Sequence, residues 1–92
     1  MRDQTPVTLR VVYLARLREA FATAGESVAV PAGSEATVAG LLDTLRQRGG
    51  PFAAELAPGR AVRVAINHSM ANPSEALRDG DEVALFPPVT GG

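Results

Sequence analysis

The 92-residue sequence contains no cysteine, no lysine and no tryptophan, and it has only one histidine, His68. Without cysteine the chain has no disulfide, no thiolate metal ligand and no cysteine nucleophile. One histidine without cysteine is a poor basis for a transition-metal centre, so we expect no metal site and no bound cofactor. The chain therefore has few of the side chains that small enzymes commonly use as nucleophiles, bases or metal ligands.

Long apolar segments are missing as well. No run approaches the roughly 20 apolar residues that span a bilayer. Residues 1–6 are polar and lack the apolar region of a signal peptide. We therefore expect a cytoplasmic protein that makes no contact with a membrane.

Positive charge is not in excess. The nine basic residues are opposed by ten acidic ones, which gives a formal net charge of −1. Nucleic-acid-binding domains are usually strongly basic, so we expect no nucleic-acid partner. All nine basic residues are arginine, which we attribute to genomic base composition. The consequence for chemistry is that no side chain carries an amine, so any amide formed through the C-terminus must use a partner's amine or the N-terminus.

Apolar residues recur with two periods along the chain. Alternation of apolar and polar side chains is typical of strands, and spacings of three and four residues are typical of amphipathic helices. Strands are predicted at Val7–Tyr13, Glu26–Val30, Ala61–Asn67 and Glu82–Phe86, and helices at 14–21, from Thr37 to residue 48 and at Phe52–Leu56.

The helix that begins at Thr37 has the clearest boundaries. Threonine is a good N-cap, and a Gly-Gly pair at 49–50 is a typical helix end. Residues 68–75 are predicted to form a polar loop, and Leu77 to be a single buried apolar residue. This order of elements predicts an α+β fold in which a helix packs across one face of a mixed sheet, with the first and last strands as central neighbours.

The end of the chain is the most informative segment. The last predicted strand runs directly into Pro87-Pro88, which favours extended geometry. Val89 and Thr90 follow, and then Gly91-Gly92, whose lack of a Cβ lets a chain enter a narrow channel. Six such residues reach about 20 Å. We divide the chain into a domain at 1–86 and a reactive tail at 87–92; the alternative is a tail without function.

Several segments together resemble the MoaD type of the MoaD/ThiS sulfur-carrier family. The ending FPPVTGG is the most specific of them, and Gly-Gly alone is much less so. The segments that carry the resemblance are 79–92, 65–67 (AIN), 11–19 and the start of the second helix at 37–42. They extend over nearly the whole chain.

The resemblance implies the ubiquitin-like β-grasp fold and a covalent mechanism centred on Gly92. It implies that a ubiquitin-activating-like adenylyltransferase uses ATP to adenylate the Gly92 carboxylate, which then becomes a thiocarboxylate. The tail would deliver this sulfur into the large subunit of molybdopterin synthase, to cyclic pyranopterin monophosphate. The chain would be a sulfur-donating subunit, not catalytic alone. Sulfur carriage for thiamin synthesis or tRNA thiolation, protein modification and a β-grasp interaction domain with an inert tail stay as alternatives.

Three other features of the sequence are candidates for a functional role. His68 is interpreted as a solvated loop residue, because no second ligand stands at metal-binding spacing. The acidic residues Asp79, Asp81 and Glu82 surround a glycine turn and are interpreted as turn residues. Phe86 should point away from the core by strand alternation, and we predict that it contacts a partner protein.

Overall fold

The computed structural model describes residues 5–88. Its elements are β1 (Val7–Tyr13), α1 (Arg16–Phe21), β2 (Gly25–Val30), the 3₁₀ turn η1 (Gly33–Glu35), α2 (Val38–Arg46), α3 (Gly50–Glu55), β3 (Arg63–Ile66), β4 (Ser69–Ala71) and β5 (Glu82–Phe86). Val89, Thr90, Gly91 and Gly92 lie outside the described residues, so the predictions that concern them are not located in the structure.

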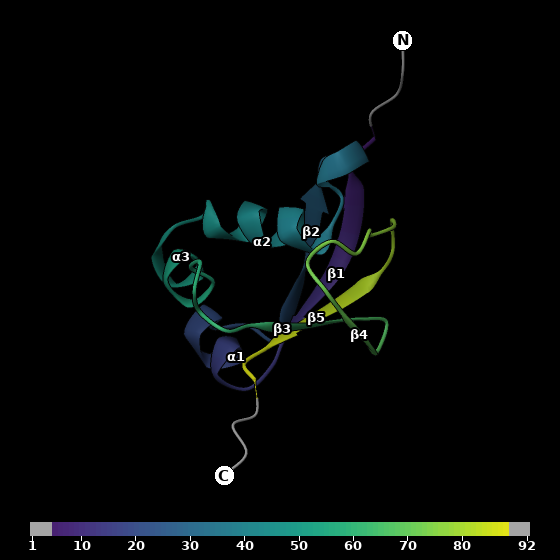
Figure 1. Ribbon diagram of the computed structural model, residues 1–92. Coiled ribbons are helices and arrows are strands. Elements are labelled where there is room, and N and C mark those ends of the chain that lie inside the picture. Colours follow the sequence, from purple (N-terminus) through teal and green to yellow (C-terminus); the bar gives the residue numbers. More distant parts are fainter. Residues whose placement is uncertain (1–4, 89–92) are drawn as a thin grey trace.

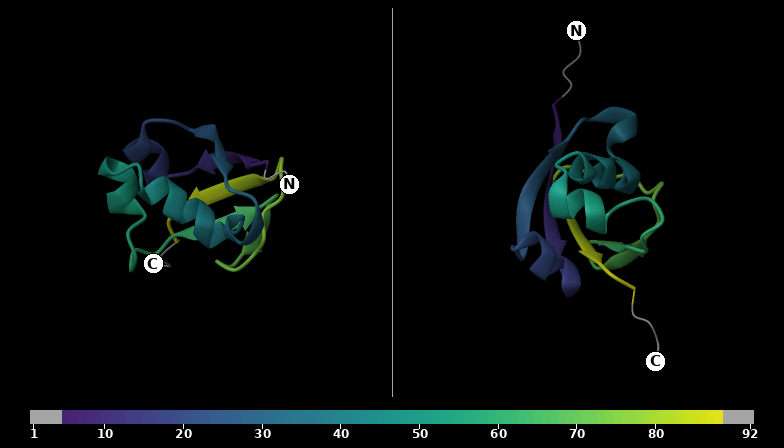
Figure 2. Two further views of the ribbon diagram at one scale, coloured as in Figure 1. Left: turned by 90° about the horizontal axis from the view of Figure 1, so that it is seen from above. Right: turned by 90° about the vertical axis from the view of Figure 1, so that its left-hand side faces the viewer.

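The strands form one mixed sheet in the order β2-β1-β5-β3-β4. The two central strands, β1 and β5, are parallel, and the other neighbouring pairs are antiparallel. Helix α2 lies across one face of this sheet, and α1 and α3 lie near the end at which β5 leaves it (Figures 1 and 2). The predicted α+β architecture and the central pairing of the first and last strands are confirmed.

The core lies between the sheet and the helices. In β1 the alternate residues Leu9, Val11 and Tyr13 are buried, and in β5 Val83 and Leu85 are buried. The facing side of α2 contributes residues spaced by three and four positions: Val38, Leu41 and Leu45. The apolar face of the sheet and the apolar face of α2 therefore pack against each other, as the two residue periods in the sequence predict.

The first turn of α2 contains two specific contacts. The Thr37 hydroxyl accepts a hydrogen bond from the backbone N–H of Gly40 at 3.1 Å, which confirms the predicted N-cap. Gly40 also passes close to η1: a Cβ on Gly40 would lie only 1.9 Å from the carbonyl oxygen of Glu35. Glycine is therefore required here by a contact between backbones, which no helix-propensity argument reveals.

Two of the predicted elements are wrong in detail. The first helix was expected to include Leu14 on its apolar face, but α1 begins at Arg16 and Leu14 is 42% exposed. The intervening Ala15 has a φ of 53°, which a continuing helix does not permit. A backbone turn thus separates the strand from the helix, and the three-and-four spacing of Leu14 is coincidental.

The predicted loop at 68–75 contains a strand, β4, which pairs with β3. The two strands are joined by Asn67 and His68, and both have positive φ, 48° and 73°. Positive φ at both central residues is the geometry of the tight hairpin turn that asparagine and glycine favour. Because the second position holds histidine and not glycine, the sequence pattern does not predict this turn.

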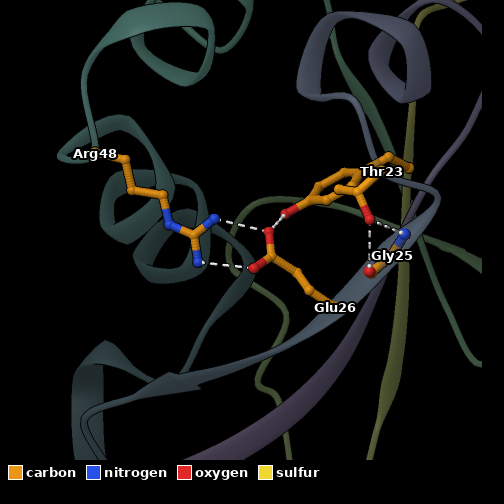
Figure 3. A network of polar contacts seen from close by, with 5 residues as sticks. Thr23, Gly25, Glu26 and Arg48 are labelled. Atoms are coloured by element: carbon orange, nitrogen blue, oxygen red, sulfur yellow. Dashed lines mark hydrogen bonds and ion pairs between the residues drawn. The ribbon is translucent and has the colours of Figure 1, made fainter.

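A ring of five side chains joins the helices to the edge of the sheet. Tyr13 donates a hydrogen bond of 2.6 Å to Glu26, and Arg48 donates two more to the same carboxylate, at 2.7 and 3.1 Å (Figure 3). The Arg48 guanidinium lies 4.8 Å from the centre of the Phe52 ring. Phe52 stacks on Phe21, and Phe21 meets Tyr13 edge-on. The ring connects β1, β2, α1, α3 and the turn after α2.

This ring makes the fold sensitive to acid. The hydrogen bonds from Arg48 hold the pKa of Glu26 below its ordinary value of 4.5. A carboxylate with a lowered folded pKa stabilises the fold at neutral pH and loses that contribution as pH falls through the folded value. We expect the free energy of unfolding to fall more steeply below about pH 4.5 in the natural protein than in Glu26→Gln. Urea denaturation between pH 7 and pH 3 measures this.

Glu19→Gln is the matched control for this experiment, because Glu19 is an exposed carboxylate on α1. The control should keep the acid slope of the natural protein. An unchanged slope in Glu26→Gln would contradict the role given to the ring.

Candidate functional site: the root of the C-terminal tail

The tail leaves the domain at the end of the central strand β5. We call Phe86, Pro87 and Pro88 the tail root; all three are partly buried. Val83 and Leu85 are fully buried, so Phe86 and Ala84 point to the other side of the sheet. The predicted orientation of Phe86 away from the core is confirmed. Its contact with a partner protein stays a prediction.

The sheet face turned away from the helices, which we call the outer face, is apolar at its centre. Strand register places Val12, Ala84, Ala65 and Met70 in one row across four strands, next to Phe86. Met70 is 60% exposed, and Met70 and Leu14 are the two exposed large hydrophobic residues of the described part of the chain. Val12, Ala84 and Phe86 are partly buried and Ala65 is buried, so the row is a small apolar surface whose exposed member is Met70.

Backbone contacts hold the end of β5 between the end of β1 and the start of β3. The Leu14 N–H, directly after β1, donates to the Leu85 carbonyl at 3.0 Å and so continues the ladder between β1 and β5. On the other side, Arg63 lies opposite Phe86 in the antiparallel register of β3 and β5. The point from which the tail leaves is therefore held on both sides.

An ion-pair cluster near the tail root was not anticipated from the sequence. Oε1 of Glu55 on α3 forms an ion pair with Arg16 at 3.3 Å and accepts a hydrogen bond from Arg60 at 3.0 Å. The three residues come from α1, α3 and the loop before β3. Their sequence separations follow no helical or strand pattern, so nothing in the sequence signals that they meet.

The remaining predicted candidates serve turns. Asp79 accepts from the backbone N–H of Thr8 at 2.7 Å, and Asp81 accepts from that of Arg78 at 2.8 Å. The Asn67 amide donates to the other oxygen of Asp81 at 2.9 Å. These bonds bear out the turn interpretation for Asp81, whereas Asp79 ties the turn to β1 and Glu82 is the first residue of β5. Within residues 5–88 no three histidine or acidic side chains come together in a metal-binding arrangement.

The outer face and the tail root are parts of a domain with known relatives. The profile of the ThiS family matches residues 11–92, which include β5, the tail root and the glycine ending. The chain belongs to the ThiS family. The resemblance read from the FPPVTGG ending and the segments before it is thereby confirmed.

Members of this family with similar sequences and structures have been described. The chain is 34% identical over 84 residues to the molybdopterin synthase sulfur carrier subunit of Escherichia coli, covering 91% of this chain and 99% of the relative. The crystal structure of H. volcanii small archaeal modifier protein 1 is 28% identical with a TM-score of 0.70, covering 90% of this chain and 99% of that one.

The family fold extends to more distant proteins. A ubiquitin from Caldiarchaeum subterraneum superposes with a TM-score of 0.55 at 16% identity, covering 96% of this chain and 100% of that one. This likeness concerns the fold alone, and it confirms the expected ubiquitin-like β-grasp. In the described part of the chain no helix has the length and apolar character to cross a membrane.

Proposed function

We propose that this protein is the sulfur carrier subunit of a molybdopterin synthase, with Gly92 as its reactive residue. The observation that carries the proposal is the FPPVTGG ending on a ThiS-family domain, at the end of a central strand that is held on both sides. The names of the curated relatives support it. No described side chain competes as a reactive centre, since the candidate residues His68, Asp79 and Asp81 lie in turns.

The first step activates the Gly92 carboxylate. A carboxylate is a poor electrophile, so one of its oxygens attacks the α-phosphorus of ATP and pyrophosphate leaves. The resulting acyl adenylate has AMP as a good leaving group. We assign this step to a separate adenylyltransferase of the ubiquitin-activating type, as the resemblance to the MoaD type implies.

The second step installs sulfur, and the third delivers it. A donor of the hydrosulfide class attacks the Gly92 carbonyl carbon, a C–S bond forms, and AMP leaves. The thiocarboxylate is ionised at neutral pH and nucleophilic, by the same logic that makes thiolates reactive. Its sulfur attacks a carbon of cyclic pyranopterin monophosphate in the large synthase subunit, so that a C–S bond forms and the oxygen substituent on that carbon leaves. Water then hydrolyses the resulting thioester, which leaves the sulfur on the pterin and releases Gly92 as a carboxylate. Two such deliveries build the dithiolene.

The outer face is the proposed docking surface for the large subunit. The apolar row and Phe86 adjoin Pro87-Pro88, which have restricted φ and so set the direction in which the tail leaves. Burying a partly exposed phenylalanine against a partner contributes up to about 1.5–3 kcal/mol. A partner seated here would receive the tail from a fixed starting point.

Replacing Phe86 with arginine tests this surface. Because Phe86 does not belong to the core, we expect Phe86→Arg to melt close to the natural domain, as followed by circular dichroism. We also expect its affinity for the large subunit, measured by titration calorimetry, to fall about ten-fold or more. The reason is the loss of apolar burial together with an unpaired charge in the contact.

Ala39→Arg is the matched control, since Ala39 is an exposed residue of α2, which covers the opposite face of the sheet. It should change neither the melting temperature nor the affinity. Normal binding by Phe86→Arg would place the interface elsewhere, and an unfolded variant would show that Phe86 stabilises the domain.

Protein modification is the second candidate function, because the small archaeal modifier protein shares this fold at 28% identity. The two functions differ in the product at Gly92. Incubation with the adenylyltransferase, ATP and sulfide, followed by intact-mass analysis, should show exchange of one oxygen for sulfur if the chain is a sulfur carrier. Amides to lysines of other proteins would instead indicate a modifier.

A further inference from the structure

Two arginines lie on the outer face of the sheet. Strand alternation places Arg10 on this face together with Val12. It places Arg63 there as well, because the next residue, Val64, belongs to the core. Both arginines are exposed. Arg10 has an acidic residue, Glu82, as its register partner on β5, so positive and negative charge adjoin at that end of the face.

Arg63 has no such counterpart. Its register partner on β5 is Phe86, and the ladder with β4 begins one residue later, at Val64. The arginines that form ion pairs within residues 5–88 are Arg16, Arg46, Arg48 and Arg60. Arg63 is therefore an exposed guanidinium without a carboxylate partner in the described part of the chain.

The position of Arg63 beside the tail root gives this charge a consequence for binding. Antiparallel register partners lie about 4.5–5.5 Å apart at their Cα atoms, so Arg63 and Phe86 are neighbours on one face. A partner that covers Phe86 therefore covers Arg63 too. Covering removes water from the guanidinium, and a charge that loses its water without gaining an opposite charge weakens the complex strongly. A partner that binds tightly here must supply an anionic group at Arg63.

We propose that the outer face binds a partner surface that is apolar opposite Phe86 and Met70 and carries an aspartate or glutamate opposite Arg63. The partner is the large subunit, so the inference rests on the proposed function and adds to it the chemistry of the docking site. Arginine presents its N–H donors in a planar fork that matches a carboxylate with two parallel hydrogen bonds. Such a pair fixes the rotation of the domain on its partner, and with it the direction in which Pro87 leaves β5.

Zero-length cross-linking of the complex tests whether a carboxylate lies at this position. The natural sequence has no lysine, so Arg63→Lys introduces its only side-chain amine. A carbodiimide activates a carboxylate of the large subunit, the new amine attacks the carbonyl carbon, a C–N bond forms, and the carbodiimide leaves as a urea. Arg78→Lys is the matched control, because Arg78 precedes β5 and lies at the opposite end of that strand from Phe86.

The expected product is an amide from position 63 to an aspartate or glutamate of the large subunit, located by peptide mapping. Its yield should be about ten-fold or more above that from position 78, because the reacting groups are already in contact in the complex.

Charge reversal tests what the pair contributes to binding. Arg63→Glu and Arg78→Glu change the net charge by the same amount, and both side chains are exposed, so both variants should melt like the natural domain. We expect Arg63→Glu to lower the affinity for the large subunit about ten-fold or more at low salt, measured by titration calorimetry. The loss should shrink at about 1 M salt, where charges are screened within about 3 Å. Arg78→Glu should bind within about two-fold of the natural protein.

The outcomes separate this inference from the function on which it rests. Equal affinities of the two charge-reversed variants would overturn the inference and leave the proposed function standing. So would the absence of an amide from position 63 in a complex that forms normally. Failure of the natural protein to bind the large subunit would overturn the proposed function, and this inference with it.

Discussion

Deletion of Gly92, or extension of the chain by a C-terminal tag, is expected to abolish sulfur transfer. In the proposed mechanism the only reacting group that this chain supplies is the Gly92 carboxylate, so a missing or blocked carboxylate leaves nothing to adenylate. The melting temperature should change very little, because the buried core of the described residues runs from Leu9 to Leu85 and ends before the tail. Turnover with the large subunit and a thermal melt measure the two effects.

The matched control carries the same tag at the N-terminus. Residue 7 begins a strand parallel to β5, so β1 starts at the end of the sheet opposite the tail root. This control should transfer sulfur at the natural rate. Activity retained in the C-terminally tagged protein would show that Gly92 is not the reactive residue.

Gly40→Ala is expected to destabilise the domain by about 1–3 kcal/mol, or roughly 5–20 °C in melting temperature. Alanine is the better helix former by up to about 1 kcal/mol, so propensity alone predicts the opposite sign. The deciding contact is the Glu35 carbonyl oxygen, 1.9 Å from where the new Cβ would stand. Both partners are backbone, so relief requires α2 or η1 to move and strains the Thr37 cap. Thermal and urea denaturation give the sign directly.

The neighbouring exchange Ala39→Gly is the control. Ala39 is exposed in the same turn of α2. If helix propensity governed this turn, exchanging alanine and glycine at the two positions would have opposite effects. We expect both variants to be less stable than the natural protein. A more stable Gly40→Ala would show that η1 yields to the added methyl group at little cost.

The parts of this protein that the sequence determines are those set by local periodicity and by local chemistry. The alternation in 7–13 and 82–86 predicts both central strands with their observed bounds, because a strand with one buried face repeats every two residues. Thr37 marks the start of α2 because its hydroxyl bonds a backbone group only three residues away. The same reasoning gives the orientation of Phe86 and singles out the FPPVTGG ending.

Tertiary structure alone decided the features that depend on residues far apart in the chain. Leu14 has helical spacing, yet the strained turn at Ala15 leaves it exposed beside β5. Strand β4 exists because β3 offers it a partner edge, although its own three residues carry almost no strand signal.

The surroundings of the tail root belong to this second group. Arg63 faces Phe86 across 23 positions of sequence through strand register, and Glu55 gathers Arg16 and Arg60 from separate elements. Sequence periods relate residues two to four positions apart, whereas these longer-range contacts depend on the order of the strands and on how the helices pack. The FPPVTGG ending is therefore readable from the sequence, whereas the arginines that surround the point from which the tail departs are brought together only when the chain is folded.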